Sequence, residues 1–190
     1  PTTESDSYSF ISGGLHWFAG GTVEYRVVGA EPVSGGNTAV VAGEEEWDAL
    51  IAGRNFARND ATTQTNPCTG LPNSITWAPI DGPGGVVGST SPCYVIGAKE
   101  IVGFNITLDN GESWGTNGAA TVIDVADVAT HEFGHAVGLG HVGAPRDGCL
   151  TMYKFVMDGE IQKRTLGLGE KLGLAKVYGN TNITAGTCGS

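Results

Sequence analysis

One run of eleven residues constrains this chain more than any other feature of its sequence. It reads His-Glu-Phe-Gly-His-Ala-Val-Gly-Leu-Gly-His over 131–141. His131 and His135 are four residues apart, so on a helix both imidazoles project from one face toward a single ion. Gly138 can adopt a positive φ without steric cost, so the helix can stop there and the chain can turn back. That turn would bring in His141 as a third nitrogen ligand.

Three histidines around a tetrahedral zinc leave the fourth position for water, which is the arrangement of a catalytic site. Glu132 lies beside a ligand without being one, so its carboxylate can take a proton from that water. A short His-Glu-x-x-His motif also arises by chance on amphipathic helices. Chance is a poor explanation for the full eleven-residue motif with its extra glycine and third histidine, because three of the four histidines in the chain fall within it. The pattern therefore predicts one zinc held by His131, His135 and His141, with Glu132 as the base.

Charge and composition exclude several classes of partner. The chain carries 20 acidic and 10 basic residues, a formal net charge of −10. Nucleic-acid binding requires clustered lysine and arginine against the phosphates, so we expect no nucleic-acid partner. No apolar stretch approaches the ~20 residues of a membrane-spanning helix. With 190 residues the chain can bury a sizeable core in one domain, and we expect a monomer.

The chain contains four widely spaced cysteines without a Cys-x-x-Cys pair: Cys68, Cys93, Cys149 and Cys188. Zinc ribbons need close pairs, so a thiolate metal site is disfavoured. Two disulfides in an extracellular protein are favoured over four reduced thiols. Of the three connectivities, we favour Cys68–Cys93 with Cys149–Cys188, because each bond then closes a loop within one part of the chain.

Hydrophobic periodicity predicts a mixture of strands and helices in an α+β fold. Patterns typical of strands cover residues 22–28, 74–78 and 100–109. Helical patterns cover residues 43–59, 124–138 and 169–178. The stretch over 81–92 is rich in glycine, proline and serine and shows no strand pattern. This order of elements predicts a mixed sheet with the metal helix packed beneath it.

Two of the predicted helices rest on specific residues. The helix over 43–59 rests on an apolar stripe made by Trp47, Leu50, Ile51 and Phe56. The metal helix has Asp124 as its N-cap candidate, with Asp127 three residues later in the manner of a capping box. We therefore expect the metal helix to begin at about residue 124.

The metal motif and the residues that follow it resemble a known family. Followed by Cys-Leu-Thr-Met-Tyr over 149–153, the motif is similar to that of the metzincin zinc endopeptidases, and within them the chain resembles a matrixin (matrix metalloproteinase-like) catalytic domain. Supporting matches are His16-Trp17, Trp47 and the segments 168–172 and 177–179. The resemblance covers most of the chain. It implies a twisted, mixed five-stranded sheet with three helices and a zinc cleft.

The same resemblance implies one catalytic domain over 1–190, with an upper subdomain over about 1–140 and a lower one over about 141–190. It implies that His131, His135 and His141 bind the catalytic zinc and that Glu132 acts as general base and then as acid. Met152 would form the Met-turn, a tight loop whose side chain lies under the zinc.

For the substrate, the resemblance implies a pocket and an edge strand. The pocket for the side chain after the scissile bond would be lined by Tyr153, Lys154 and Phe155. The strand that holds the extended substrate would be formed by Val87, Gly88, Ser89 and Thr90. We expect the pocket to be apolar and to favour an aliphatic or aromatic residue after the scissile bond.

One departure from the family bears on the cofactors. Many matrixins carry a second, structural zinc bound by three further histidines and an aspartate, but His16 is the one histidine outside the motif here. The chain therefore predicts a single catalytic Zn²⁺. Calcium is assigned to no residue, because the usual calcium loop has no clear counterpart over 81–92.

These features predict a secreted zinc-dependent endopeptidase that hydrolyses extended protein or peptide substrates. Zinc lowers the pKa of its water toward neutrality and Glu132 removes the proton. One alternative is a catalytically silent, zinc-containing binding or adhesion module. Glu132 argues against it, since a structural site needs no base beside its ligands. A second alternative is a metzincin of another family, which would share the zinc and the base and differ in the cleft.

Overall fold

The computed structural model describes residues 4–18, 20–51, 53–179 and 183–184. Its main sheet has five strands: β2 (Gly21–Val28), β3 (Arg54–Arg58), β4 (Asn73–Ala78), β5 (Gly88–Val95) and β6 (Glu100–Asp109). The strand order is β3-β2-β4-β6-β5, and all neighbours are parallel except β5, which runs antiparallel to β6 at one edge. The helices are α1 (Gly36–Asp48), α2 (Val125–Ala136) and α3 (Leu168–Tyr178). The α+β fold with a mixed five-stranded sheet and three helices is therefore confirmed.

Shorter elements complete the described part of the chain. Two small ladders pair β1 (Ser9–Phe10) with β9 (Leu139–Gly140) and β7 (Trp114–Gly115) with β8 (Ile123–Asp124). Single 3₁₀ turns cover Ile11–Gly13, Pro145–Asp147 and Gln162–Arg164. The β1–β9 ladder matters for the site, because it fixes the segment that leads from the end of α2 to His141.

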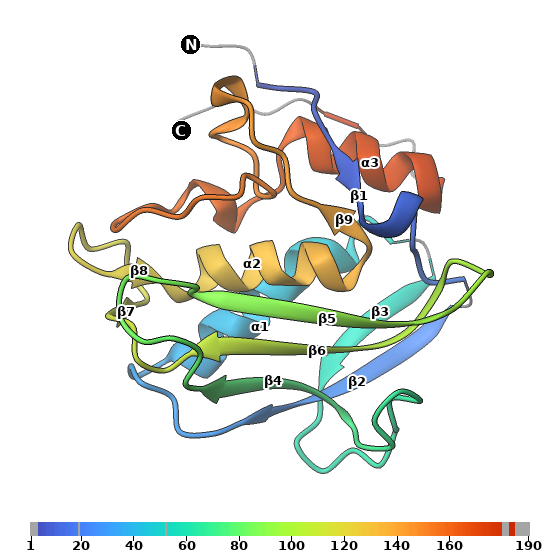
Figure 1. Cartoon of the computed structure of the whole chain (residues 1–190), viewed down its shortest axis with the longest axis horizontal. Helices are drawn as coiled ribbons and strands as arrows, with labels where there is room; N and C mark the ends of the chain where they lie inside the picture. Colours follow the sequence, from blue (N-terminus) through green and yellow to red (C-terminus); the bar gives the residue numbers. More distant parts are fainter. Residues whose placement is uncertain (1–3, 19, 52, 180–182, 185–190) are drawn as a thin grey trace.

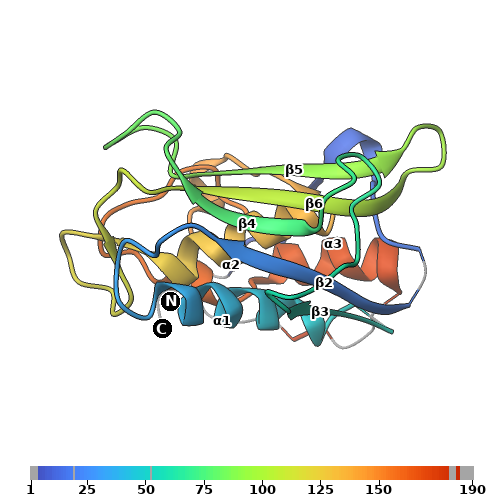
Figure 2. The ribbon, with the colours of Figure 1, turned by 90° about the horizontal axis from the view of Figure 1, so that it is seen from below.

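Helices α1 and α2 lie against the same face of the sheet, and α3 lies on the far side of α2 from the sheet (Figures 1 and 2). Phe133 of α2 is fully buried, and its ring lies 5.6 Å from that of Tyr25 and 5.7 Å from that of Phe104. Phe133 falls midway between His131 and His135, on the opposite side of the helix. The aromatic core therefore holds α2 with its two motif histidines turned away from the sheet.

The predicted helix over 43–59 is wrong at both ends. Helix α1 begins seven residues earlier and ends at Asp48, and Phe56 is a core residue of β3 instead of a helical one. Gly43, which looked like a boundary, lies inside α1, where a Cβ would come within 2.7 Å of the Thr130 amide nitrogen. Close packing of α1 on α2 thus requires glycine inside a helix, a tertiary reason that local propensity cannot show.

Strand β5 is missed by the sequence pattern, since 81–92 showed no strand signal. β5 begins at Gly88, contains Pro92 and continues to Val95. Proline is tolerated because β5 is the edge of the sheet, where one side of the strand needs no partner. The glycine, proline and serine residues of β5 are compatible with an edge strand, but they do not produce the alternation of apolar and polar residues by which a strand is predicted.

The predicted Cys68–Cys93 disulfide is present and ties the loop before β4 to β5. It anchors the edge strand at a point beyond the segment that faces α2. The other predicted bond, Cys149–Cys188, falls on Cys188, which lies outside the described residues. That pairing stays a prediction.

A buried acid in α1 predicts an unusual dependence of stability on pH. The Glu44 side chain is 2% exposed; its Oε2 accepts a 3.2 Å hydrogen bond from the Tyr25 hydroxyl, and its Oε1 has no partner among the described residues. Burial, and next the charge of Asp48, raises the pKa of Glu44 from 4.5 to about 8. The folded chain therefore keeps this proton over a range in which the unfolded chain has lost it.

The proton on Glu44 stabilises the folded chain, because the pKa of this carboxyl is higher in the folded state than in the unfolded state. This stabilisation is complete below about pH 4.5 and is lost as the pH rises toward 8. The Glu44→Gln variant mimics the protonated form, so it should match the parent at pH 4.5. At pH 8.5 it should exceed the parent by up to about 5 kcal/mol, since one pKa unit is worth about 1.4 kcal/mol. Urea unfolding across this pH range measures the difference. Parallel curves for the two proteins would contradict the assignment.

Candidate metal centre

Helix α2 presents the first two histidines as the spacing predicted. Asp124 is its N-cap, and the Asp124 carboxylate accepts a 3.1 Å hydrogen bond from the Asp127 amide. The helix ends at Ala136, two residues before Gly138, which has φ +101°. A Cβ at Gly138 would collide with the carbonyl oxygen of Leu15. Glycine is therefore needed both for the backbone angle and for the close approach that starts β9.

Strand β9 then carries the chain to His141, and the three imidazoles meet. The Nε2 atom of His141 lies 3.0 Å from Nε2 of His131 and 3.0 Å from Nε2 of His135. All three ligand atoms lie within 4.8 Å of one another. Two nitrogens bound about 2.0–2.1 Å from one tetrahedral zinc would be separated by about 3.3 Å, close to the spacing seen here.

The hydrogen bonds behind the rings test whether these residues fit a metal ion. The Nδ1 atom of His131 donates to the carbonyl of Thr151 at 2.6 Å, and that of His135 donates to the carbonyl of Leu139 at 2.8 Å. A carbonyl can only accept, so both Nε2 atoms carry lone pairs while the rings are neutral. His141 has at most one proton to offer two facing lone pairs. A cation at the meeting point removes that conflict, so the donor set fits zinc.

The electrostatics of the site favour the metal-binding form of each ring. Burial lowers the pKa of His131 to about 3 and that of His135 to about 4, and it also lowers the pKa of His141. Neutral imidazole is the form that coordinates a metal. The site is thus built to hold three neutral nitrogens close together at neutral pH.

Glu132 lies beside the histidines and is 4% exposed. Its Oε2 accepts a 2.6 Å hydrogen bond from the Thr90 hydroxyl of β5, which leaves Oε1 for another proton. Burial raises the pKa of Glu132 to about 7, against a lowering by the Thr90 hydrogen bond. Gly88 makes room for this carboxylate, since a Cβ there would come within 2.7 Å of Oε1. The geometry can therefore support general acid–base chemistry.

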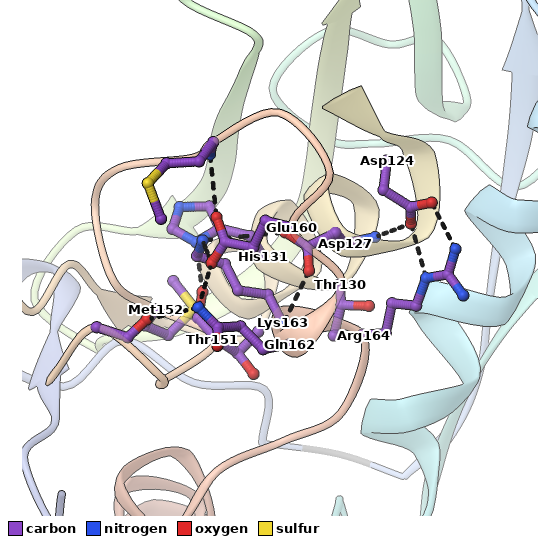
Figure 3. A network of polar contacts seen from close by, with 12 residues as sticks. Asp124, Asp127, Thr130, His131, Thr151, Met152, Glu160, Gln162, Lys163 and Arg164 are labelled. Atoms are coloured by element: carbon purple, nitrogen blue, oxygen red, sulfur yellow. Dashed lines mark hydrogen bonds and ion pairs between the residues drawn. The ribbon is translucent and has the colours of Figure 1, made fainter. Parts of the chain in front are cut away.

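Met152 lies where a Met-turn residue would lie. It is 2% exposed, and a Cβ added at Gly134 of α2 would collide with its sulfur. The Met152 amide donates a 2.9 Å hydrogen bond to Oε1 of Glu170, which is 1% exposed on α3. Through the neighbouring Thr151 carbonyl, the same turn orients the His131 ring (Figure 3). The turn that contains Thr151 and Met152 thus packs against α2 and fixes the orientation of one of its histidine rings.

A cleft of about 330 Å³ opens beside the histidines, within the usual range for ligand pockets. It brings together the predicted pocket residues Tyr153, Lys154 and Phe155 and the predicted edge residues Val87 and Gly88. The rest of its lining consists of Gly85, Val86, Asp127, Val128, His131, Glu132, His141, Val156 and Lys163. Ser89 and Thr90 belong to β5 and lie outside this lining.

Several residues at the site escaped sequence reasoning. Thr90 was expected as a substrate-strand residue, and its bond to Glu132 was not foreseen. The cleft lining also contains Asp127, which was assigned only to helix capping, and Lys163, which was assigned nothing. Glu170, on α3, accepts a hydrogen bond from the Met152 amide. The sequence contains only a weak signal for the charged residues among them, namely that each stands close to apolar residues in the chain.

Comparisons with known proteins place this fold and site in a family. Residues 72–179 match the family model described as matrixin. Matrilysin from Rattus norvegicus is 31% identical over 104 residues, which cover 55% of this chain and 36% of that protein. Matrix metalloproteinase-25 from Homo sapiens is 35% identical over 109 residues, covering 56% of this chain and 18% of that protein. The chain thus spans about a third or less of the length of these relatives.

Among solved structures, myroilysin is similar with a TM-score of 0.50 and 14% identity, covering 88% of this chain and 97% of that one. At this identity the similarity concerns the fold alone. Together, the fold and the three-histidine centre define an α+β protein with a candidate metal site at the end of α2. Because the family model covers more than half of the chain, the chain belongs to the matrixin family.

Proposed function

We propose that this protein is a zinc-dependent endopeptidase that hydrolyses extended protein substrates. The observation that carries the proposal is the buried carboxylate of Glu132 beside three convergent, neutral imidazoles in an open cleft. His131, His135 and His141 would hold one catalytic zinc. No residue is proposed for calcium.

When bound, zinc would polarise a water molecule and lower its pKa, and it would stabilise negative charge on the substrate carbonyl oxygen. Thr90 holds Oε2 of Glu132, so Oε1 is the atom proposed to accept the proton. Glu132 then delivers this proton to the leaving amine. The carbonyls of Thr151 and Leu139 keep the His131 and His135 rings in one orientation throughout.

The substrate backbone would bind along β5. This strand is an edge of the sheet, and its first residue, Gly88, lines the cleft together with the preceding Val87. An extended peptide can add to such an edge through main-chain hydrogen bonds, which select conformation rather than sequence. Opposite this edge, the wall formed by Tyr153, Lys154 and Phe155 would receive the side chain after the scissile bond.

The apolar walls favour an apolar stem on that side chain. The cleft lies between Gly85–Gly88 and Tyr153–Val156, which fits one catalytic domain over 1–190 with subdomains meeting near residue 140.

The disulfide and the family both support an extracellular location. No helix among the described residues is long and apolar enough to cross a membrane. We expect a monomer.

Hydrolysis of a peptide library with mass-spectrometric identification of the products tests this function. The protein should bind roughly one zinc per chain, and a chelator should abolish cleavage and lower the melting temperature, because metal binding stabilises the folded state. Added zinc should restore both. The rival function, a silent zinc-containing binding module, predicts bound zinc and the same stabilisation with no product. That result would overturn the proposal.

A further inference from the structure

The lining of the cleft includes two buried charged residues, and a third charged residue pairs with one of them. Asp127 and Lys163 both line the cleft, although they are 0% and 2% exposed. Glu160 is 8% exposed and pairs with Lys163. Other lining residues are open to solvent, with Val86 48% and Phe155 58% exposed. The mouth of the cleft is therefore exposed and largely apolar, and its floor is buried and charged.

Figure 3 shows the contacts among these residues, and one carboxylate oxygen of the group has no hydrogen bond. The Nζ group of Lys163 donates a hydrogen bond to Oε1 of Glu160, and the Lys163 backbone amide donates one to Oδ1 of Asp127 at 2.7 Å. The Lys163 Nζ atom lies 3.9 Å from Oδ2 of Asp127, too far for a hydrogen bond. Oδ2 of Asp127 is buried and has no hydrogen-bond partner among the described residues.

The charges of the floor do not balance. When Asp127 is ionised, Lys163 supplies one positive charge against the two carboxylates of Glu160 and Asp127. The nearby Arg164 adds nothing, because it already binds Asp124 through Nε at 2.8 Å. Burial raises the pKa of Asp127 to about 7, which reflects the cost of a carboxylate without a full set of partners. The floor therefore lacks one donor, preferably a cationic one.

We infer that this pocket selects a lysine or arginine immediately after the scissile bond, with the cationic end of that side chain bound to Oδ2 of Asp127. The inference rests on the proposed function, since it assigns the pocket to that substrate position. It departs from the apolar preference expected from the resemblance, because it adds a charged floor to apolar walls.

The walls suit the stem of such a side chain. The apolar residues of the lining are Val86, Val87, Val128, Tyr153, Phe155 and Val156. Lysine and arginine bury their methylene stems along such surfaces while their charged ends reach a polar group. A leucine would leave Oδ2 of Asp127 unpartnered, and a glutamate would add a third carboxylate to the floor. The ion pair with Glu160 offsets the positive charge of Lys163, which reduces its repulsion of the incoming cation.

Binding of short peptides to the wild-type zinc protein tests this without requiring turnover. The peptides have a free N-terminus, represent the product after cleavage, and begin with lysine, norleucine, glutamine or glutamate. Norleucine keeps the lysine stem and lacks the ammonium group. Calorimetry should give at least about tenfold tighter binding for lysine than for norleucine, and the weakest binding for glutamate. Equal or tighter binding of norleucine would overturn the inference.

The Asp127→Asn variant locates the effect. Its amide oxygen can still accept from the Lys163 backbone, while the atom at Oδ2 becomes a donor. We expect the lysine preference to fall about tenfold or more and glutamine or glutamate to gain. The matched control, Asp6→Asn, removes the same charge at an exposed position outside the lining and should keep the parent preference. An unchanged lysine preference in Asp127→Asn would also overturn the inference.

The same peptides separate this inference from the proposed function. Lysine-selective binding with no hydrolysis of a substrate library would refute the endopeptidase and support the pocket. Hydrolysis with leucine or norleucine preferred after the scissile bond would support the endopeptidase and refute the charged floor as a determinant of specificity. The wild-type binding series remains decisive if Asp127→Asn proves unstable.

Discussion

We expect Glu132→Gln to lower kcat by roughly 10²- to 10⁴-fold while leaving the zinc content unchanged. Glutamine has the same shape and can still accept the Thr90 hydroxyl proton at the position of Oε2. The amide nitrogen of glutamine at the position of Oε1 cannot accept a proton, so no base remains to deprotonate the water. Because this group acts in the transition state, the substrate KM should change much less than kcat.

Metal analysis and steady-state kinetics on the same preparation make this test specific. Glu45→Gln is a matched control, because it makes the same chemical change at an exposed position on α1 and should keep full activity. Retention of full peptidase activity by Glu132→Gln would overturn the proposed mechanism. Loss of zinc along with activity would instead make Glu132 a structural residue of the site.

Gly138→Ala should be the most damaging small substitution in this chain. At φ +101° the added Cβ meets the Leu15 carbonyl oxygen, a backbone atom that cannot rotate away. The Gly138 carbonyl also accepts a 2.9 Å hydrogen bond from the Ile11 amide, so any shift pulls on the β1–β9 ladder. We expect a loss of about 3–5 kcal/mol in stability and at least about tenfold weaker zinc binding, because His141 follows this turn.

Urea unfolding of the zinc-free and zinc-loaded forms measures both effects. The matched control is Gly148→Ala, where φ is −56° and the nearest atom to the new Cβ is 3.5 Å away. This control should unfold within about 1 kcal/mol of the parent. If Gly138→Ala were as stable as Gly148→Ala and bound zinc normally, the turn at Gly138 would not be what positions the third ligand.

The parts of the fold that could be predicted are those carried by local patterns. Strand β6 alternates along its whole length, and the predicted range of 100–109 is the observed one. The N-cap at Asp124 is also found as predicted, while the Asp127 carboxylate accepts from the Lys163 amide and not, as in a capping box, from the Asp124 amide. Periodicity misplaced helix α1 and missed strand β5, of which only the start was expected from the resemblance, because close packing at Gly43 and an edge position at Pro92 are properties of neighbours distant in sequence.

The candidate site divides along the same line. The three histidines and Glu132 could be recognised from the sequence, because helical spacing and one glycine turn bring their side chains together whatever surrounds them. Only the tertiary structure decided which ring nitrogens face the metal position, since the carbonyls of Thr151 and Leu139 set them. It also decided that Thr90 holds the base and that Oδ2 of Asp127, a residue of the cleft lining, has no hydrogen-bond partner. These partners come from separate segments, and only burial makes their charges and hydrogen bonds matter.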